Sequence, residues 1–303
     1  MLTLKDDEFH FIVSFMKSNY GIILEKKRPL IEGREKKRPL IEGRLSNHVA
    51  GLGFQNYMDY FKYAMEGKEN KTNDEIITII NKLTTNHTYF LRESEHFTFY
   101  KEIILPWVDK NLKSNDLRVW SAGCSSGQEP YTLSMITLDY LGHNASEWDS
   151  TLLASDISNK ALLAAKKGVY SSEELIRIPK IWMKKYFTKL DRGNYAVTDL
   201  IKNNVAFRNF NLLSPFNFKK PFHAIFCRNV MNLLSPFNFK KPFHAIFCRN
   251  VMIYFDMPTK KQIIDKFYDA LLPGGYLLIG HSESLSSCKH NFKYLRPSVY
   301  QKV

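Results

Sequence analysis

The sequence predicts an α/β fold, in which a parallel sheet is covered by helices on both faces and a small all-α domain precedes it. Two observations predict this fold. From residue 117 onward, short apolar runs of strand length alternate with helical segments, the order that gives parallel strands joined by helical crossovers. Residues 1–83 instead carry helical periodicity and no strand pattern. Hydrophobic residues make up 44% of the 303-residue chain, enough to bury a sizeable core.

A helical N-terminal domain is predicted over residues 1–83. One helix is expected to begin at a Thr3 cap, because apolar residues follow it at i, i+3, i+4 and i+7 spacing. Another is expected after Asn73, where two acidic residues precede an apolar face. The two apolar faces comprise Phe9, Ile12, Val13 and Met16, and Ile76, Ile79, Ile80 and Leu83. The segment 84–95 opens with polar and β-branched residues that interrupt this periodicity, and it is predicted to be a linker.

The α/β domain is predicted over residues 96–303, and a helix is expected to run from just after Ser94 to Pro106, across the start of this domain. Buried strands are expected at 117–122, at 151–156, at 222–227 or 243–248, and at 276–280. The helices between them are bounded by capping residues, proline and glycine, and are expected at 130–141, 158–167 and 259–272. Residues from about 184 to 209 break the alternation. They predict an inserted antiparallel β-subdomain with strands at Tyr195 and Val205.

Two blocks of the sequence are repeated without change. E-K-K-R-P-L-I-E-G-R occupies 25–34 and 35–44, and a 21-residue block occupies 211–231 and 232–252. Units of repeat proteins diverge and usually occur three or more times at one period, so we interpret both as artefactual duplications and not as solenoid units. Two copies cannot occupy one strand position. The sequence leaves open whether Asn211 or Asn232, and Asn229 or Asn250, lines a site.

The composition restricts the partners and the location. Lys and Arg (43) exceed Asp and Glu (30), and the formal charge of +13 favours nucleic acid, a membrane surface or an acidic protein as partner. The four cysteines lack the C-x-x-C spacing of metal and redox motifs, and the first residues lack a signal-peptide pattern. We therefore expect no bound metal and a reducing, cytoplasmic location. No apolar run approaches about 18 residues, so no membrane insertion is expected.

The strongest local motif is V-W-S-A-G-C-S-S-G-Q-E-P-Y at 119–131. It is typical of a buried strand that passes through a glycine-containing turn into a helix, where a doubly wound fold binds its ligand. Gly123 and Gly127 would let the backbone approach that ligand, and the helix N-terminus favours an anionic group. The G-x-x-x-G spacing weakens a dinucleotide interpretation, which needs G-x-G-x-x-G. A plain strand-to-helix turn is the alternative.

Polar residues follow the predicted strands. Asp156 could accept hydrogen bonds from ribose hydroxyls, or it could cap the next helix. Glu129 suits an ammonium group, or the dipole of its own helix. Arg249, Asn250 and Tyr254 follow the strand of the repeated block, on the ligand side of a parallel sheet. A turn-capping Asn and a core-packed Tyr are the alternatives for the last two.

Six motifs in order resemble the CheR family of chemoreceptor methyltransferases. They are T-T-N-H-T-Y-F-L-R-E at 84–93, S-A-G-C-S-S-G-Q-E-P-Y, A-S-D-I, N-L-L, C-R-N-V-M-I-Y-F-D and G-H-S-E-S, and they span nearly the whole chain. The resemblance implies a Rossmann-like class I S-adenosylmethionine-dependent methyltransferase domain, with a helical N-terminal domain and an inserted β-subdomain. It implies that the protein esterifies receptor glutamates, with S-adenosylmethionine as methyl donor and S-adenosylhomocysteine as product.

The motifs and this resemblance together imply a cofactor site to which the linker 84–95 contributes. Its residues are Asn86, Thr88, Arg92, Gly123, Glu129, Asp156, Asn211, Leu212, Arg249 and Asn250. We expect Arg92 to orient a carboxylate of the cofactor or the acceptor, and Tyr254 to form a wall near the methyl group. An acceptor glutamate is ionised at neutral pH and needs no strong general base, so alignment is expected to be the main catalytic effect.

The expected partner is the acidic helical bundle of a receptor, which basic residues from Lys26 to Arg44, with Lys62 and Lys68, would attract. The hairpin at 190–195 is short for the family, so no binding of a C-terminal pentapeptide tether is expected. The N/D-P-P-Y/F tetrad of amino-methylating nucleic-acid enzymes is absent, and no nucleic-acid partner is expected. A nucleic-acid methyltransferase and a non-catalytic S-adenosylmethionine-binding regulator remain the alternatives.

Overall fold

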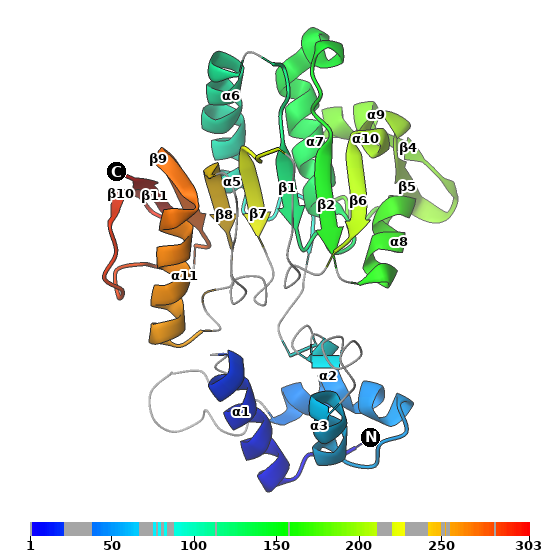
Figure 1. Cartoon of the computed structure of the whole chain (residues 1–303). Coiled ribbons are helices and arrows are strands. Elements are labelled where there is room, and N and C mark those ends of the chain that lie inside the picture. The colour runs from blue at the N-terminus through cyan, green and yellow to red at the C-terminus, as the bar shows by residue number, and fades with distance from the viewer. Residues whose placement is uncertain are drawn as a thin grey trace. The chain divides into compact units, whose positions relative to one another are not determined.

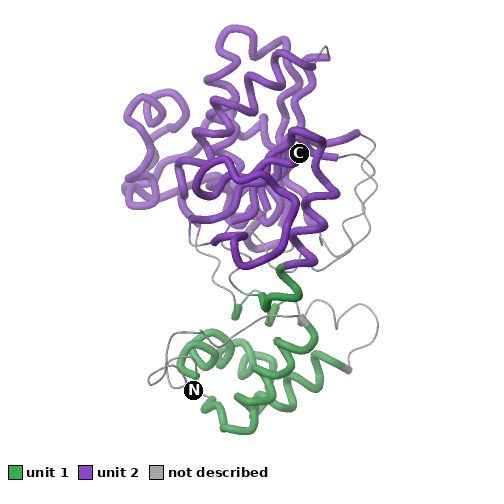
Figure 2. The backbone as a smooth tube through the Cα atoms, turned by 90° about the vertical axis from the view of Figure 1, so that its left-hand side faces the viewer, with its two compact units in different colours: residues 1–87, 254–260 green, residues 88–253, 261–303 purple. Residues whose placement is uncertain are grey.

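The computed structural model of the chain divides into two compact units (Figure 2). One contains residues 1–87 and 254–260, and the other contains residues 88–253 and 261–303. The structure describes residues 2–20, 38–66, 75–76, 78–79, 82–83, 88–112, 114–156, 158–210, 220–227, 242–249, 252, 255–281 and 283–303.

The smaller unit is helical where it is described. Its helices are α1 (Asp6–Tyr20), α2 (Arg38–Gly51) and α3 (Tyr57–Glu66). The predicted first helix is confirmed, but it begins at Asp6 and not at Thr3. The reason is Glu8, whose carboxylate accepts the Lys5 N–H at 2.9 Å and so caps the first turn from within. The other carboxylate oxygen of Glu8 accepts the Tyr57 N–H at 2.8 Å, which fixes the start of α3.

The helix expected after Asn73 is described only in part. The described residues 75–76, 78–79 and 82–83 are helical. Ile76, Ile79 and Leu83 are buried, as the predicted apolar face requires. Of the shorter repeated block, the second copy enters α2, and the copy at 25–34 lies outside the described residues.

The larger unit is built on an eight-stranded sheet with the order β10-β11-β9-β8-β7-β1-β2-β6 (Figure 1). The strands from β9 to β6 in this order are parallel, whereas β11 and β10 are antiparallel to their neighbours. Their bounds are β1 (Val119–Ala122), β2 (Leu152–Asp156), β6 (Val205–Asn209), β7 (Ala224–Cys227), β8 (Phe243–Cys248), β9 (Leu271–Ile279), β10 (Phe292–Arg296) and β11 (Val299–Lys302).

Both copies of the longer repeated block contribute a strand. β7 and β8 are parallel neighbours, and their identical residues face each other, with Phe226 opposite Phe247 and Cys227 opposite Cys248. The two phenylalanine rings stack with centroids 4.0 Å apart and an interplanar angle of 6°. From the sequence, the two copies of the block are candidates for a single strand position. In the structure, both copies form strands, and these strands lie next to each other.

A long helical segment precedes β1, and it does not end at Pro106 as predicted. α5 (Ser94–Phe99) continues through a π-helical segment, η1 (Tyr100–Ile104), into α6 (Leu105–Asn111). Pro106 lies in the first turn of α6, where its missing N–H disturbs the helix least. Buried residues from this segment, including Phe97 and Tyr100, pack with Phe226 and Phe247 in one core cluster.

The remaining helices follow the predicted order with small shifts. α7 (Gln128–Leu141) is capped by Gly142 and α8 (Asn159–Lys167) by Gly168 at their C-termini, and α11 (Met257–Asp269) ends three residues before the predicted position. α11 is shorter because Leu271 already pairs with Phe243 as part of β9. A short 3-10 helix, η2 (Gly142–Glu147), follows α7.

A second, three-stranded antiparallel sheet has the order β3-β5-β4. Its strands are β3 (Val169–Ser171), β4 (Phe187–Lys189) and β5 (Asn194–Val197), accompanied by α9 (Lys180–Tyr186), η3 (Asp191–Gly193) and α10 (Asp199–Asn203). The predicted strand at Val205 does not belong to it. That strand is β6, which pairs in parallel with β2, so the expected extent of the insertion was wrong at both ends. No helix in the described ranges is long and apolar enough to cross a membrane.

Candidate active site

The order of the strands places a ligand site at the carboxyl end of β1. The chain runs outward from β1 through β2 to β6 on one side, and through β7, β8 and β9 on the other. In open parallel sheets, ligands bind beyond the carboxyl ends of the strands at such a switch point. Figure 1 shows that β1, β2, β7 and β8 all end at the same edge of the sheet.

The turn between β1 and α7 has backbone angles that require glycine. Gly123 and Gly127 have φ values of 85° and 96°, and the backbone N–H groups of Gly123 and Cys124 both donate to the Ser155 carbonyl. A Cβ atom at Gly127 would lie 2.9 Å from the Tyr170 hydroxyl and 3.0 Å from the Ala165 Cβ. The turn is therefore held closely against β2 and α8, and Gly127 is needed for packing whether or not a ligand is bound.

Asp156, at the end of β2, fixes this turn. Its Oδ2 accepts the Ser125 N–H at 2.8 Å, and its Oδ1 accepts the Ser158 N–H at 2.9 Å. The cap of α8 is supplied by Ser158, whose hydroxyl oxygen accepts the Ala161 N–H at 3.2 Å. Asp156 is thus not the helix cap. A carboxylate oxygen can accept more than one hydrogen bond, so Asp156 is also a suitable acceptor for ligand hydroxyls.

Glu129 is a buried carboxylate in the first turn of α7. Its side chain is 0% exposed, and its Oε1 accepts the Ser121 hydroxyl at 2.9 Å. Its Oε2 lies 3.7 Å from Nη1 of Arg249, which is an ion-pair distance but longer than a hydrogen bond. The helix N-terminus stabilises this negative charge, so both sequence interpretations of Glu129 are compatible with its position.

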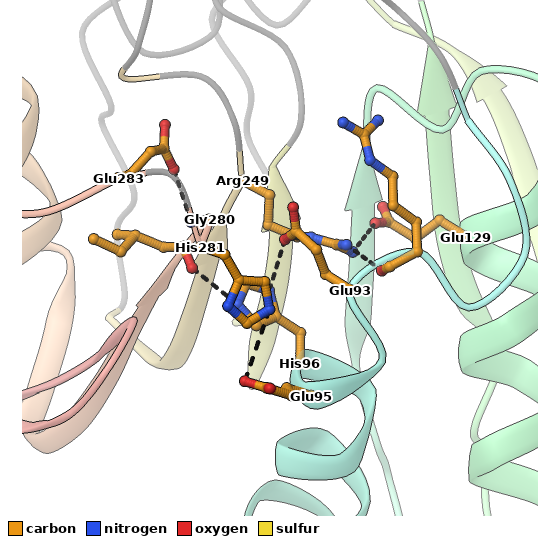
Figure 3. A network of polar contacts seen from close by, with 10 residues as sticks. Glu93, Glu95, His96, Glu129, Arg249, Gly280, His281 and Glu283 are labelled. Carbon is orange, nitrogen blue, oxygen red and sulfur yellow. Dashed lines mark hydrogen bonds and ion pairs between the residues drawn. The ribbon is translucent and has the colours of Figure 1, made fainter.

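Arg249 follows β8 and is 2% exposed. Figure 3 shows it between Glu93 and Glu129. Its Nε donates to Glu93 Oε2 at 2.6 Å, and its Nη2 donates to the backbone carbonyl of Arg92. Its Nη1 has no hydrogen-bond partner among the residues that the structure describes. Because burying an unsatisfied donor is costly, Nη1 is well suited to receive a ligand acceptor.

Glu93 and His96 belong to this network, and sequence reasoning assigned a role to neither. His96 Nε2 donates to the Ile279 carbonyl at 2.9 Å, and its Nδ1 lies 3.8 Å from Glu93 Oε2. Burial, helped by the nearby Arg249 charge, lowers the pKa of His96 to about 3, so the imidazole is neutral. Glu93 lies in the first CheR-like motif, next to Arg92, and that motif was the only available signal for it.

The other predicted residues are only partly described. The Arg92 guanidinium carbon lies 5.8 Å from the centre of the Tyr89 ring, and Thr88 is half-buried. Thr88, Arg92, Gly123, Glu129, Asp156 and Arg249 all lie in the larger unit. The predicted residues Asn86, Asn211, Leu212, Asn250 and Tyr254 lie outside the described residues.

Cys124 lies in the same turn but is not an available nucleophile. It is 1% exposed, and burial together with the charges of Asp156 and Glu129 raises the pKa of its thiol. A thiol in this environment stays protonated at neutral pH. The chemistry of the site therefore depends on the carboxylates and guanidinium groups.

These groups fit one kind of ligand. Asp156 can accept from vicinal hydroxyls, Glu129 can accept from an ammonium, and Nη1 of Arg249 can donate to a carboxylate. A nucleoside that carries an amino acid has all three groups. The buried Nη1 atom is the structural observation that tests this fit, because such a ligand would satisfy it.

Comparison with known proteins agrees with this deduction. Residues 86–236 and 231–300 match the family model described as "CheR methyltransferase, SAM binding domain". A "Chemotaxis protein methyltransferase" of Borreliella burgdorferi is 36% identical over 306 residues, covering 99% of this chain and 96% of the relative. A relative of the same name from Escherichia coli is 32% identical over 304 residues, covering 99% and 92%.

Fold, site and comparisons together define a class I S-adenosylmethionine-dependent methyltransferase. Within that class, the chain belongs to the CheR family of methyltransferases. The predictions of the family, the fold class, the enzyme class and the cofactor are thereby confirmed. The two family matches overlap at the junction of the longer duplication, between residues 231 and 236, which indicates that one copy is additional to the family pattern.

Proposed function

We propose that this enzyme transfers a methyl group from S-adenosylmethionine to glutamate side chains of chemotaxis receptors. The products would be glutamyl methyl esters and S-adenosylhomocysteine. The observation that carries the proposal is the set formed by half-buried Asp156 with buried Glu129 and Arg249 at the switch point of a CheR-family sheet. The names of the relatives, which are chemotaxis protein methyltransferases, support the receptor as substrate.

Each residue has a proposed role in holding the cofactor. Asp156 would bind the ribose hydroxyls, and the backbone of the turn from Gly123 to Gly127 would lie against the adenosyl group. Glu129 would bind the ammonium group, because it is a buried carboxylate at ion-pair distance from a guanidinium that is already paired elsewhere. Nη1 of Arg249 would donate to the cofactor carboxylate. Asn86, Thr88, Asn211, Leu212 and Asn250 are proposed to complete the pocket.

The proposed mechanism depends on alignment. The bound cofactor would supply an electrophilic methyl group on a sulfonium, and an ionised glutamate would attack it in line. The enzyme then needs no strong general base, since a glutamate side chain is ionised at neutral pH. We assign Arg92 the task of orienting a carboxylate and Tyr254 the task of forming a wall near the methyl group. Holding the reacting atoms in line can contribute up to about 7–11 kcal/mol in the best cases.

The smaller unit is proposed to attract the acidic helical bundle of the receptor. Of its described cations, Lys62 is exposed, whereas Arg38 and Arg44 are engaged within the unit. Arg38 pairs with Asp6, and Arg44 donates to the Leu83 carbonyl at 2.8 Å. Lys62, with the lysines of the segment that begins at Lys26 and with Lys68, is thus the better candidate for steering the receptor than the two arginines.

The antiparallel β-subdomain is proposed not to bind a receptor's C-terminal pentapeptide. Its hairpin turns between β4 and β5 within residues 190–193, which leaves little backbone for a peptide. A cytoplasmic location is also proposed, since the four cysteines are free thiols, three of them buried. Neither nucleic acid nor membrane insertion has a part in this proposal.

The proposal is tested by transfer of tritium-labelled methyl groups to receptor fragments and to DNA, assayed side by side. Base-labile label in the receptor fragment is the expected result, because methyl esters hydrolyse in base. Label in DNA would contradict the receptor as substrate. Tight binding of S-adenosylhomocysteine without transfer to either acceptor would identify a non-catalytic regulator.

A further inference from the structure

The segment that carries Arg92 has an unusual backbone. The residues on both sides of it, Leu91 and Glu93, have φ values of 57° and 54°, in the left-handed region. Residues other than glycine rarely adopt this region. A residue that does is held there by its surroundings, at a cost in conformational energy. Glu93 is also the residue that precedes the first turn of α5. The conformation of Arg92 is therefore imposed by contacts made on either side of it.

Arg249 supplies the contacts on the Glu93 side of Arg92. On the other side, Leu91 packs against the hydrophobic core. The Arg249 guanidinium reaches the segment twice, through the Glu93 carboxylate at 2.6 Å and through the Arg92 carbonyl. Its side chain is 1% exposed, so its charge requires a close counter-ion. His96, another ionisable neighbour of Glu93 in Figure 3, is neutral, whereas Arg249 is a cation paired with the Glu93 carboxylate.

Two carboxylates compete for this guanidinium. Glu93 holds it by a hydrogen bond at 2.6 Å, whereas Glu129 lies 3.7 Å from Nη1. If the charge of Glu93 were lost, the strongest remaining partner for Arg249 would be Glu129. A short movement of the guanidinium would bring Nη1 within hydrogen-bond distance of Glu129 and form a direct ion pair. The carboxylate proposed to bind the cofactor ammonium would then be occupied by the protein itself.

We propose that Glu93 is a positioning residue that holds Arg249 away from Glu129 and so keeps the subsite for the amino-acid part of the cofactor open. This inference rests on the proposed cofactor site. Glu93 would not touch the cofactor. It would act through Arg249, by directing Nη1 toward the cofactor carboxylate and by fixing the backbone carbonyl of Arg92.

The test compares two nucleosides by titration calorimetry. S-Adenosylhomocysteine contains the amino-acid group, and 5′-methylthioadenosine lacks it. Glu93→Gln is expected to weaken S-adenosylhomocysteine binding about tenfold, the usual effect of losing one charge-assisted hydrogen bond. Binding of 5′-methylthioadenosine is expected to be unchanged, because Asp156 and the turn after β1 are untouched. Glu95→Gln is the matched control, since the Glu95 side chain is 73% exposed and pairs only distantly with His281, at 3.7 Å.

A double variant tests the route through Glu129. If Glu93 acts by keeping Arg249 off Glu129, then Glu93→Gln should have little further effect on S-adenosylhomocysteine affinity in a Glu129→Gln background.

Equal weakening of both nucleosides by Glu93→Gln, or no weakening of either, would overturn the inference. Should Glu93→Gln fail to fold by circular dichroism, Glu93→Met, which also removes the charge at similar side-chain volume, must show the same selective loss for the inference to stand. Failure of the unaltered enzyme to bind either nucleoside would instead contradict the proposed function.

Discussion

Two buried histidines in the larger unit make its stability depend on pH. His96 is 1% exposed and His244 is 6% exposed, and burial lowers their pKa values to about 3 and about 4. His244 stacks on Trp107 with ring centroids 3.6 Å apart, so it is packed as an aromatic ring. Both side chains bind a proton more tightly in the unfolded chain, where the histidine pKa is about 6.5. Acid therefore favours unfolding as the pH falls below about 6.5. The loss of stability is complete once the pH reaches the histidine pKa values of the folded protein.

We expect each of these histidines to reduce the free energy of unfolding by about 2 kcal/mol between pH 7 and pH 5. His244→Phe keeps a flat ring against Trp107 and removes the titration, so it should remove one such contribution. Urea unfolding at the two pH values measures this. His143→Gln, at an exposed position after α7, should lose as much stability in acid as the unaltered chain. If His244→Phe has the same pH dependence as the unaltered chain, the histidine is not buried in its neutral form.

At the scale of elements, the turn between β1 and α7 places the site. It is anchored by the Ser155 carbonyl, by Asp156 and by close packing of Gly127 against α8. The tyrosine that meets Gly127 is itself fixed, because the Tyr170 hydroxyl donates to the Ser126 carbonyl at 2.7 Å. A larger side chain at position 127 would therefore displace the start of α7, and Glu129 would move with it.

Gly127→Ala is expected to destabilise the protein by about 2–5 kcal/mol, because the left-handed backbone strain and the contact with Tyr170 add together. S-Adenosylhomocysteine affinity should fall as well. Gly53→Ala is the control: Gly53, in the smaller unit, also has a positive φ, of 87°, but a Cβ there would meet nothing within 4 Å. Its cost should be about 1–2 kcal/mol, with unchanged ligand affinity. Equal costs at both positions, measured by thermal unfolding and calorimetry, would contradict the packing argument.

The sequence predicted the elements that local patterns specify, and it missed those that depend on distant contacts. β1, β2 and α7 have apolar runs with capping residues, and they lie within a few residues of their predicted bounds. β10 was not predicted, because only one of its five residues is buried and it carries no apolar alternation. The contact of Glu93 with Arg249 joins residues 156 positions apart, so no local pattern indicates it. Motif order predicted that Arg92 and Arg249 belong to one site, but it could not show that the Arg249 guanidinium donates to the Arg92 carbonyl.

At the scale of the whole molecule, the duplicated strand is the main departure from the family pattern. β7 and β8 have the same sequence and pair in register, and the family matches overlap where the two copies join. Because the copies are identical and adjacent, deleting either one gives the same shorter chain. In that chain, the single remaining strand can pair with both β1 and β9, since each copy carries the same residues to either side.

Deletion of one 21-residue copy should therefore leave a folded protein that binds S-adenosylhomocysteine at least as tightly as the full chain does. Circular dichroism and calorimetry on the two chains, prepared in parallel, measure the outcome. Loss of both folding and binding on deletion would show that the enzyme needs the additional strand.

The central claim is that the turn after Ala122 and the carboxylate of Asp156 together hold an adenosyl group, with Glu129 and Arg249 at its amino-acid end. A crystal structure with S-adenosylhomocysteine bound tests it most directly. The claim predicts ribose hydroxyls within hydrogen-bond distance of Asp156, the ammonium on Glu129, and the carboxylate on Nη1 of Arg249. The ligand bound elsewhere, or Arg249 paired directly with Glu129 and blocking the position, would contradict it.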